Sequence, residues 1–464
     1  MENFDLIVIG SGPAGEKAAA QAAYFGKRVL IVEKETVVGG AMVNTGTIPS
    51  KTLRETALFL SGKRLRGMYG VDLHEGREFS VQDLMFRKTL IIKREIEMIN
   101  ENLARHKVKQ VSGAAYFIDE HTIGIEGSEE RYSGDFILIA VGSYPFQPPT
   151  IPFEEEQVYD SDEILHMEAI PASMVIVGAG VIGCEYACMF AALGIDVTLV
   201  DPKDKILPFL DGEISSLLVE EMMELGVKFL FGESVERVEM DGRVCKTYLN
   251  GGNVLSSETH LFAAGRTGNI SRLKLENIGL TPNKRGLLEV NENYQTSIPH
   301  IYAAGDVIGF PSLASTSMEQ GRVAMCHAFD FGYKDSIAAL LPYGIYTIPE
   351  VSMVGITEDE AQSRSIDYEV GRSGYDDNPR GQIIGNERGM LKLVFAKSDK
   401  KLLGVHVIGD NASELVHIGM MVMHFGGTIE AFISSVFNYP TLSDVYKYAT
   451  YDGLGNLSGH KIKN

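Results

Sequence analysis

The chain has 464 residues, of which 45% are hydrophobic and 22% charged, so its length predicts two or three domains rather than a single core. Its formal net charge of -20 argues against binding to nucleic acid or to an anionic membrane surface, because both favour patches of Lys and Arg. No apolar run is long enough to span a membrane, and the N-terminus lacks the basic stretch of a signal peptide. We therefore expect a cytoplasmic protein that has no contact with a membrane.

A dinucleotide-binding pattern opens the chain. An apolar strand over residues 6–9 leads into the turn Gly10-Ser-Gly-Pro-Ala-Gly15, an Ala-rich helix, and a second strand that ends at Glu33. In such a turn Gly10 allows the tight bend, Gly12 lets a pyrophosphate approach the backbone, and Gly15 lets helix and strand pack. The helix N-terminus offers unpaired N–H groups and a partial positive charge to the phosphate.

The same pattern recurs about 170 residues further along the chain. A strand over residues 174–177 is followed by the glycines Gly178, Gly180 and Gly183, by a helix, and by a strand that ends at Asp201. Two copies predict two parallel units that each bind one dinucleotide. We expect Glu33 and Asp201 to accept hydrogen bonds from the ribose hydroxyls of their respective nucleotides.

Further strands end in turns of small residues. Residues 136–141 lead to Gly142, residues 260–264 lead to Gly265, and residues 300–305 lead to Asp306. A carboxylate in this place would suit the ribityl or pyrophosphate region of a flavin, although an Asp after a glycine is by itself usually a turn residue.

The pattern changes after about residue 336. Residues 390–395 and 402–408 alternate in the way that antiparallel strands do, which predicts a third domain of strands with flanking helices. The fold class is therefore α/β, with two Rossmann-like dinucleotide-binding domains and a C-terminal α+β domain. No low-complexity linker separates these parts, so we expect them to pack tightly.

The four cysteines are interpreted as small buried hydrophobic residues, because none has the spacing of a zinc site. Cys184 and Cys188 fall four residues apart on a predicted helix and therefore share one of its faces. We predict no metal site.

Together these motifs resemble the pyridine nucleotide–disulfide oxidoreductase family of glutathione reductase and dihydrolipoamide dehydrogenase, and within it the soluble pyridine nucleotide transhydrogenases. The similarity covers nearly the whole chain, with all motifs in family order. It rests on Asn44-Thr-Gly-Thr-Ile-Pro-Ser-Lys-Thr-Leu-Arg54, Gly178-Ala-Gly-Val-Ile-Gly-Cys-Glu-Tyr-Ala187, Gly265-Arg-Thr-Gly-Asn269, Pro311-Ser-Leu-Ala-Ser315, Gly344-Ile-Tyr-Thr-Ile-Pro-Glu350 and Phe437-Asn-Tyr-Pro-Thr441.

The resemblance implies an FAD-binding domain (residues 1–145 and 268–335), an NAD(P)-binding domain (146–267) and a dimerisation domain (336–464) that forms a homodimer. It implies Lys51 near the reacting end of the flavin, paired with Glu185, as the catalytic residues. The implied FAD-binding residues are Gly10, Gly12, Gly15, Glu33, Lys34, Gly39, Gly40, Thr47, Lys51, Gly142, Asp306 and Ala314. The implied NAD(P)-binding residues are Gly178, Gly180, Val181, Gly183, Asp201 and Gly265, where Val181 either covers the nicotinamide or simply packs in the core.

The sequence also departs from the family. Relatives carry two cysteines where Met42 and Thr47 stand here, and neither replacement can form a disulfide or a thiolate. Relatives also carry a His-Pro element where this chain has Tyr439, which cannot easily shuttle a proton at neutral pH. Soluble transhydrogenases share Thr47 and Tyr439 but commonly keep a cysteine in place of Met42. Both parts of the dithiol machinery are thus missing, which excludes disulfide reduction through an internal dithiol.

The preferred nucleotide is open at this point. A carboxylate at Asp201 accepts from an unmodified ribose and repels a 2′-phosphate, which favours NAD(H). Lys203 and Lys205 could reach such a phosphate, although lysines on an exposed turn are usually only solvated.

Hydride transfer needs no cysteine, because the isoalloxazine of FAD supplies the redox chemistry and the protein supplies geometry and electrostatics. The leading hypothesis is a soluble transhydrogenase that moves hydride from NADPH to NAD+ in a ping-pong reaction through FAD. An NADH-dependent flavoprotein reductase that passes electrons to a quinone or another acceptor is the alternative. A flavin-binding scaffold or sensor is a third possibility, which the presence of both glycine turns, Lys51 and Glu185 disfavours.

Overall fold

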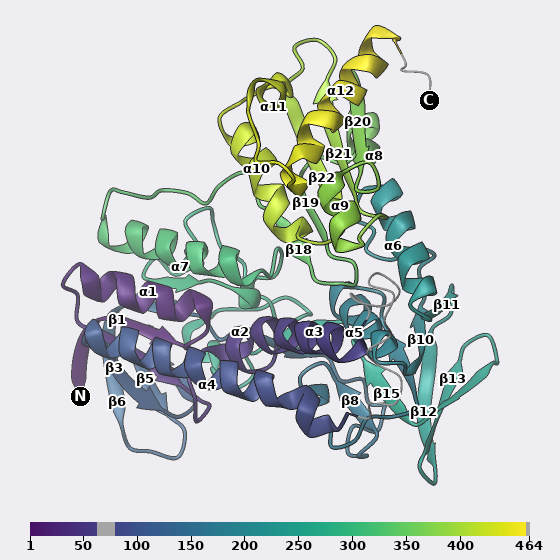
Figure 1. Ribbon diagram of the computed structural model, residues 1–464. Coiled ribbons are helices and arrows are strands. Elements are labelled where there is room, and N and C mark those ends of the chain that lie inside the picture. The colour runs from purple at the N-terminus through teal and green to yellow at the C-terminus, as the bar shows by residue number, and fades with distance from the viewer. Residues whose placement is uncertain (63–78, 461–464) are drawn as a thin grey trace.

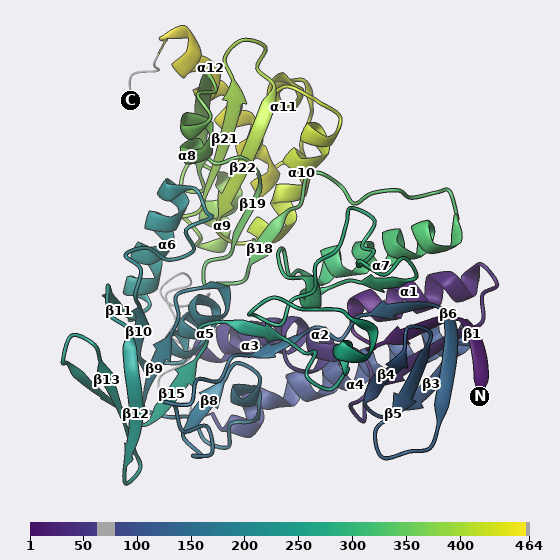
Figure 2. The same ribbon diagram turned by 180° about the vertical axis from the view of Figure 1, so that it is seen from behind.

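The computed structural model describes residues 1–62 and 79–460. Three lobes surround the middle of the molecule (Figure 1): the N-terminal sheet with α1, α4 and α7, a second lobe with α5 and α6, and the C-terminal sheet with α10–α12. The view from behind (Figure 2) shows β18 of the C-terminal lobe reaching down between the other two. The three lobes agree with the expected fold class.

The first lobe is built on a seven-stranded sheet. Its strand order is β3-β2-β1-β6-β5-β4, with β17 also paired to β6, and its central pairs are parallel. The strands are β1 (Glu2–Ile9), β2 (Val29–Glu33), β3 (Lys109–Ser112), β4 (Ala115–Asp119), β5 (Thr122–Ile125), β6 (Arg131–Ile139) and β17 (Ile301–Ala303). The helices are α1 (Pro13–Tyr24), α2 (Gly40–Asn44), α3 (Thr47–Ser61), α4 (Val81–Arg105) and α7 (Ala314–Phe329), with 3₁₀ turns η2 (Leu275–Ile278) and η3 (Asp306–Ile308).

The second lobe repeats this plan with a five-stranded parallel sheet in the order β11-β10-β9-β15-β8. A three-stranded antiparallel sheet, β12-β13-β14, lies beside it. The elements are β8 (Val158–Asp160), η1 (Glu163–His166), β9 (Ser173–Val177), α5 (Val181–Ala192), β10 (Asp196–Asp201), α6 (Gly212–Glu224), β11 (Lys228–Phe231), β12 (Val235–Asp241), β13 (Val244–Leu249), β14 (Val254–Ser257) and β15 (Thr259–Phe262).

The chain passes between these two lobes through a short antiparallel ribbon of β7 (Ser143–Pro145) and β16 (Arg266–Gly268). Helices α3 and α5 also pack against each other there, which brings the two lobes into direct contact. The central parallel strands of both sheets are covered on both faces, so β2 and β9 are nearly continuous runs of buried apolar residues.

The third lobe holds an antiparallel sheet in the order β18-β19-β22-β21-β20. Its strands are β18 (Tyr343–Ile345), β19 (Val351–Gly355), β20 (Tyr368–Gly374), β21 (Met390–Ala396) and β22 (Leu402–Ile408). Its helices are α8 (Glu358–Ser363), α9 (Pro379–Ile384), α10 (Ala412–His424), α11 (Glu430–Ser434) and α12 (Val445–Ser458), with the 3₁₀ turn η4 (Leu442–Asp444). The alternating segments at 390–395 and 402–408 are thus neighbouring antiparallel strands, as their pattern predicts.

No helix among residues 1–62 and 79–460 combines the length and apolar composition that crossing a membrane requires.

A buried ionic cluster fastens the second lobe to the third. Lys392 of β21 places its Nζ 2.8 Å from Asp211, 2.9 Å from Glu213 and 2.6 Å from Glu358. The Lys392 and Asp211 side chains are each only 1% exposed. Asp211 also caps the N-terminus of α6, so the cluster fixes the direction of that helix, which lies beside the C-terminal lobe in Figure 1. Burial raises the pKa of Asp211, but the Lys392 ammonium outweighs burial and holds this pKa below its usual value.

Replacing Lys392 with Met is expected to destabilise the fold by about 3–5 kcal/mol, because it leaves the Asp211 carboxylate buried without its cation. The measurement is the thermal unfolding midpoint of the FAD-loaded protein, with Lys397→Met as a control at a half-exposed ion pair, where about 1 kcal/mol or less is expected. The stabilisation that Asp211 provides is present at neutral pH and is lost as the pH falls below about 4. The difference between the variant and the parent protein therefore narrows in acid, and equal midpoints at pH 7 would contradict the assignment.

Candidate active site

The first glycine turn, residues 10–15, joins β1 to α1. A Cβ on Gly10 (φ +102°) would stand 2.4 Å from the Ala140 carbonyl oxygen, and one on Gly15 would stand 2.0 Å from the Gly10 carbonyl oxygen. Both positions therefore require glycine. Gly12 differs, since the nearest atom to a Cβ there is the Gly40 Cα at 3.9 Å. The second glycine thus faces an opening at the N-terminus of α1, where backbone N–H groups lack helical partners.

The second glycine turn, residues 178–183, has the same construction. A Cβ on Gly178 (φ +104°) would stand 3.0 Å from the Ala263 carbonyl, and one on Gly183 would stand 1.8 Å from the Gly178 carbonyl oxygen. At Gly180 no atom lies within 4 Å of the Cβ position. Val181 begins α5 and packs against the core of this lobe. Each of the two lobes therefore has open space at the second glycine of its turn, beside a helix N-terminus.

The carboxylates that end the second strands of both units hold these glycine turns in place. Glu33 accepts hydrogen bonds from the backbone N–H of Ser11 at 2.9 Å and from its hydroxyl at 2.6 Å. Asp201 accepts from the backbone N–H of Ala179 at 2.6 Å and of Lys203 at 2.8 Å. Each carboxylate is thereby fixed beside the opening at the second glycine.

Segment 34–40 lies partly against the first turn. The Gly39 N–H donates to the Ser11 carbonyl oxygen at 3.2 Å, and a Cβ on Gly40 would stand 2.8 Å from the Gly12 Cα. Lys34 lies outside this contact, since its half-exposed side chain pairs with Glu35 at 3.3 Å. The structure therefore places Gly39 and Gly40 beside the opening.

A series of hydrogen bonds runs from Asp306 across the β7–β16 ribbon between the first two lobes. The Ser143 hydroxyl donates to Asp306 at 2.9 Å, and Arg266 donates to both the hydroxyl and the carbonyl oxygen of Ser143 at 2.9 Å. Arg266 also pairs with Asp162 at 3.2 Å. Burial raises the pKa of Asp162 above its ordinary value despite this cation. Arg266 is thus the link that orients groups of both lobes.

Three other predicted cofactor-binding residues of this region, Gly142, Gly265 and Ala314, have side chains too small to contribute polar contacts. Gly142 (φ +67°) and Gly265 (φ +122°) immediately precede the two strands of the ribbon. Ala314 is the first residue of α7, so its N–H has no partner within the helix. All three therefore offer backbone rather than side-chain contacts.

Lys51 and Glu185 meet where α3 of the first lobe packs against α5 of the second. The Lys51 Nζ lies 2.6 Å from the Glu185 carboxylate, whose second oxygen accepts from the Tyr346 backbone N–H at 2.9 Å. The ammonium also lies 5.0 Å from the centroid of the Tyr346 ring, within the range of a cation–π contact. Glu185 is almost buried, with 5% of its side chain exposed, whereas Lys51 keeps 26%. All three lobes therefore contribute to this one site.

A buried arginine on α3 makes a further contact at the same junction. Arg54, one turn beyond Lys51 on α3, is 2% exposed and donates to the Thr347 carbonyl oxygen at 2.9 Å. It also pairs with Glu350 at 3.2 Å, and Glu350 accepts from the Ser413 hydroxyl at 2.9 Å. The helix that carries Lys51 is thus anchored to the C-terminal lobe.

No cysteine stands at the two positions where relatives carry their redox pair. Met42 lies on α2 and packs against the core of the first lobe, and Thr47 is the exposed first residue of α3. The chain's cysteines are all buried at other positions, and burial raises the pKa of Cys245 to about 11. Neither a thiolate nor a disulfide can therefore replace the missing pair.

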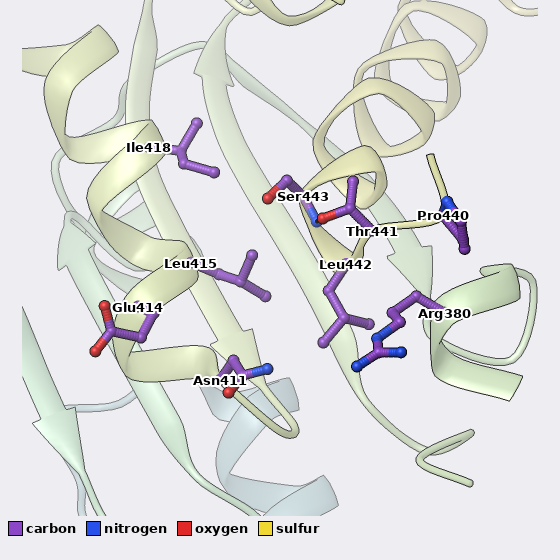
Figure 3. A pocket seen from close by; sticks show the side chains of 9 residues that line it. All are labelled: Arg380, Asn411, Glu414, Leu415, Ile418, Pro440, Thr441, Leu442 and Ser443. Atoms are coloured by element: carbon purple, nitrogen blue, oxygen red, sulfur yellow. The ribbon is translucent and has the colours of Figure 1, made fainter. Parts of the chain in front are cut away.

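Tyr439, where relatives carry a His-Pro element, is 73% exposed on the C-terminal lobe. Beside it a pocket of about 280 Å³ opens between α9, α10 and residues 440–443 (Figure 3). It is lined by Arg380, Asn411, Glu414, Leu415, Ile418, Pro440, Thr441, Leu442 and Ser443. None of the predicted cofactor-binding residues belongs to this pocket.

The residues present fit two dinucleotides. Each lobe provides an open glycine turn at a helix N-terminus with a fixed carboxylate beside it, which is the arrangement that binds a pyrophosphate and its ribose. Within residues 1–62 and 79–460, no group of three or more His, Cys, Asp or Glu side chains is arranged to hold a metal ion.

Residues 4–321 match the pyridine nucleotide-disulphide oxidoreductase family, and residues 341–450 match its dimerisation domain. The chain therefore belongs to this family of flavoprotein oxidoreductases, as its motifs predicted. It uses FAD and NAD(P)H, and it forms a homodimer.

Individual relatives and solved structures are similar to this chain over nearly their whole length. A soluble pyridine nucleotide transhydrogenase from Mycobacterium tuberculosis is 47% identical over 461 residues, which cover 98% of each chain. One from Chromohalobacter salexigens is 43% identical, over 98% of this chain and 99% of its own. Among solved structures, LpdA from M. tuberculosis superposes with a TM-score of 0.89 at 25% identity, covering 97% of this chain and 99% of its own. The HOCl-induced flavoprotein disulfide reductase RclA from Escherichia coli gives a TM-score of 0.87 at 26% identity, covering 96% and 98%.

Sequence reasoning missed several polar groups of this site. Arg266 follows Gly265 directly in the sequence, and a cation directly after a glycine turn is a signal that could have predicted its role. Tyr346 lies 161 residues from Glu185 and contributes through its backbone N–H, so its side-chain type gave no indication of this contact.

Replacing Lys51 with Ala is expected to slow reduction of the bound flavin by NAD(P)H at least about tenfold. The variant loses the cation that would stabilise the negative charge of the reduced flavin ring. Stopped-flow absorbance of the bound flavin measures this rate. Lys93→Ala, at an exposed position of α4, is the matched control and should react like the parent protein. Parent-like rates in Lys51→Ala would remove the role assigned to Lys51.

Proposed function

We propose that this chain is a transhydrogenase that moves hydride from NADPH to NAD+ in a ping-pong reaction on one nucleotide site. The observation that carries the proposal is the Lys51–Glu185 pair at 2.6 Å, set between two open glycine turns with no cysteine pair at Met42 and Thr47. The relatives named as soluble transhydrogenases support it through their identity over nearly the whole chain. Their name also supports a cytoplasmic location, which we propose as well.

FAD, when bound, supplies the isoalloxazine ring that takes up and returns the hydride. The turn at Gly12, with Glu33, Gly39 and Gly40, would hold its adenine nucleotide half. Asp306, Gly142 and the N-terminus of α7 at Ala314 would hold the remainder. We assign these groups to residues 1–145 and 268–335, an assignment that the pairing of β17 with β6 supports.

The turn at Gly180, with Gly178, Gly183 and Asp201, would bind the pyridine nucleotide within residues 146–267. Val181 and Gly265 would border its nicotinamide end. Lys51 stabilises negative charge at the reacting end, and Glu185 holds Lys51 in position. No side chain at the junction needs to shuttle a proton to a leaving thiol, which suits a chain with Tyr439 in place of the family histidine. Residues 336–464 would form the dimerisation domain.

The second candidate function is an NADH-dependent reductase that passes electrons to another acceptor. The observation in its favour is Asp201, whose carboxylate is held beside the nucleotide opening, where its charge repels a 2′-phosphate. Lys203 and Lys205 are both exposed on the following turn and would offset this repulsion.

Stopped-flow mixing separates the two functions. A transhydrogenase is expected to be bleached rapidly by NADPH and reoxidised by NAD+, and anaerobic titration should consume two electrons per FAD because no disulfide stores another pair. Bleaching by NADH alone, followed by reoxidation only with a quinone, would establish the reductase instead. Uptake of four electrons would contradict the absence of a redox disulfide.

Replacing Asp201 with Asn is expected to raise kcat/KM for NADPH relative to NADH, by about tenfold, because the repulsive charge is removed while one carbonyl oxygen still accepts a backbone N–H. Steady-state kinetics with both nucleotides give this ratio. Asp204→Asn, an exposed aspartate on the same turn, controls for a general change in charge. An unchanged ratio in Asp201→Asn would show that this residue does not read the ribose.

A further inference from the structure

Three aromatic rings from the three lobes meet at one point of the molecule. Phe209 lies on the loop before α6, Phe310 follows η3, and Tyr343 begins β18. The ring centroids of Phe310 and Tyr343 are 6.1 Å apart with an interplanar angle of 24°, and those of Phe209 and Tyr343 are 5.8 Å apart at 46°. We call these three residues the aromatic rim.

Two members of the aromatic rim are exposed to solvent, whereas Tyr343 is partly buried. Phe310 is 84% exposed and Phe209 is 42% exposed, although burial of such rings is one of the main driving forces of folding. Single exposed rings are common. A stack of rings drawn from three separate parts of the chain is a different matter, because it presents flat apolar surface in one place.

The loops that carry the two phenylalanines are held in unusual conformations. Leu207, two residues before Phe209, has φ +42°, and Ser312, two residues after Phe310, has φ +50°. Positive φ is disfavoured for residues with a Cβ and persists only where the surrounding structure holds it. The positions of both rings are therefore imposed by their surroundings.

Each member of the aromatic rim is attached to a part of the nucleotide site. The Leu207 N–H donates to the Ala179 carbonyl oxygen at 3.4 Å, which ties the Phe209 loop to the second glycine turn. Tyr343 lies on the same short segment as Tyr346, whose N–H donates to Glu185. Phe310 lies in the sequence between Asp306 and Ala314, two predicted FAD-binding residues. The three rings thus belong to segments that also carry predicted nucleotide-binding or catalytic residues.

We propose that Phe209, Tyr343 and Phe310 form a stacking platform that binds the pyridine nucleotide as it enters and leaves its site. Planar heteroaromatic groups stack favourably on aromatic side chains. NAD(H) and NADP(H) differ only by the 2′-phosphate, so such a platform strengthens the binding of both equally. This inference rests on the proposed function only in requiring that both nucleotides use one site.

The test is direct binding of NAD+ and of NADP+ to the oxidised, FAD-loaded protein, measured separately by isothermal titration calorimetry. Phe310→Ala is expected to raise both dissociation constants by a similar factor, about threefold to tenfold. Phe310→Tyr keeps the ring and should bind like the parent protein. Phe86→Ala, at a ring that is 72% exposed on α4, is the control for loss of an exposed phenylalanine elsewhere.

Kinetics supply a second readout. In Phe310→Ala the KM for each nucleotide should rise, while the flavin reduction rate at saturating NADPH stays within about twofold. Unchanged dissociation constants in Phe310→Ala, or equal losses in Phe86→Ala, would overturn the proposal. Because binding is measured without turnover, the result is independent of whether NAD+ reoxidises the enzyme.

Discussion

The contact between Lys51 and Glu185 is the interaction around which the molecule is organised. It joins a helix of the first nucleotide unit to a helix of the second, and its carboxylate is held by a backbone N–H of the C-terminal lobe. Glu185 is almost buried, so its carboxylate depends on partners for both oxygens, which Lys51 and the Tyr346 N–H provide. The anchoring of α3 through Arg54 and Glu350 meets the same requirement. The position of the two glycine-turn units relative to each other is therefore fixed where α3 packs against α5.

Loss of the cysteine pair changes what this junction must accomplish. In a disulfide-reducing relative the same frame also has to support thiolates and a proton donor from the C-terminal lobe. Here Met42 contributes apolar packing and Thr47 starts a helix, so the junction keeps the Lys51–Glu185 ion pair without a thiol beside it. An acidic chain with a net charge of -20 still binds anionic nucleotides because helix N-termini and backbone amides act over short distances.

Much of this arrangement was predictable from the sequence. Strand, glycine turn and helix recur together, and these local features identified both nucleotide units and the strands that end at Glu33 and Asp201. The antiparallel C-terminal sheet followed from alternation at residues 390–408. The contacts among Ser143, Arg266 and Asp162, and the backbone contact of Tyr346, were not predictable, because they depend on how distant lobes pack. The hydrogen bonds from Ala179 and Lys203 to Asp201 likewise became visible only in three dimensions.

The salt-bridge cluster at Lys392 has a consequence for motion. Because α6 is clamped to the C-terminal sheet through Asp211, the second nucleotide unit cannot swing on a hinge without exposing a buried cation. In a homodimer, both copies of that unit are then carried on one stiff central body formed by the paired C-terminal lobes. Opening for ligand exchange is left to short loops, which rearrange on faster timescales than whole domains do.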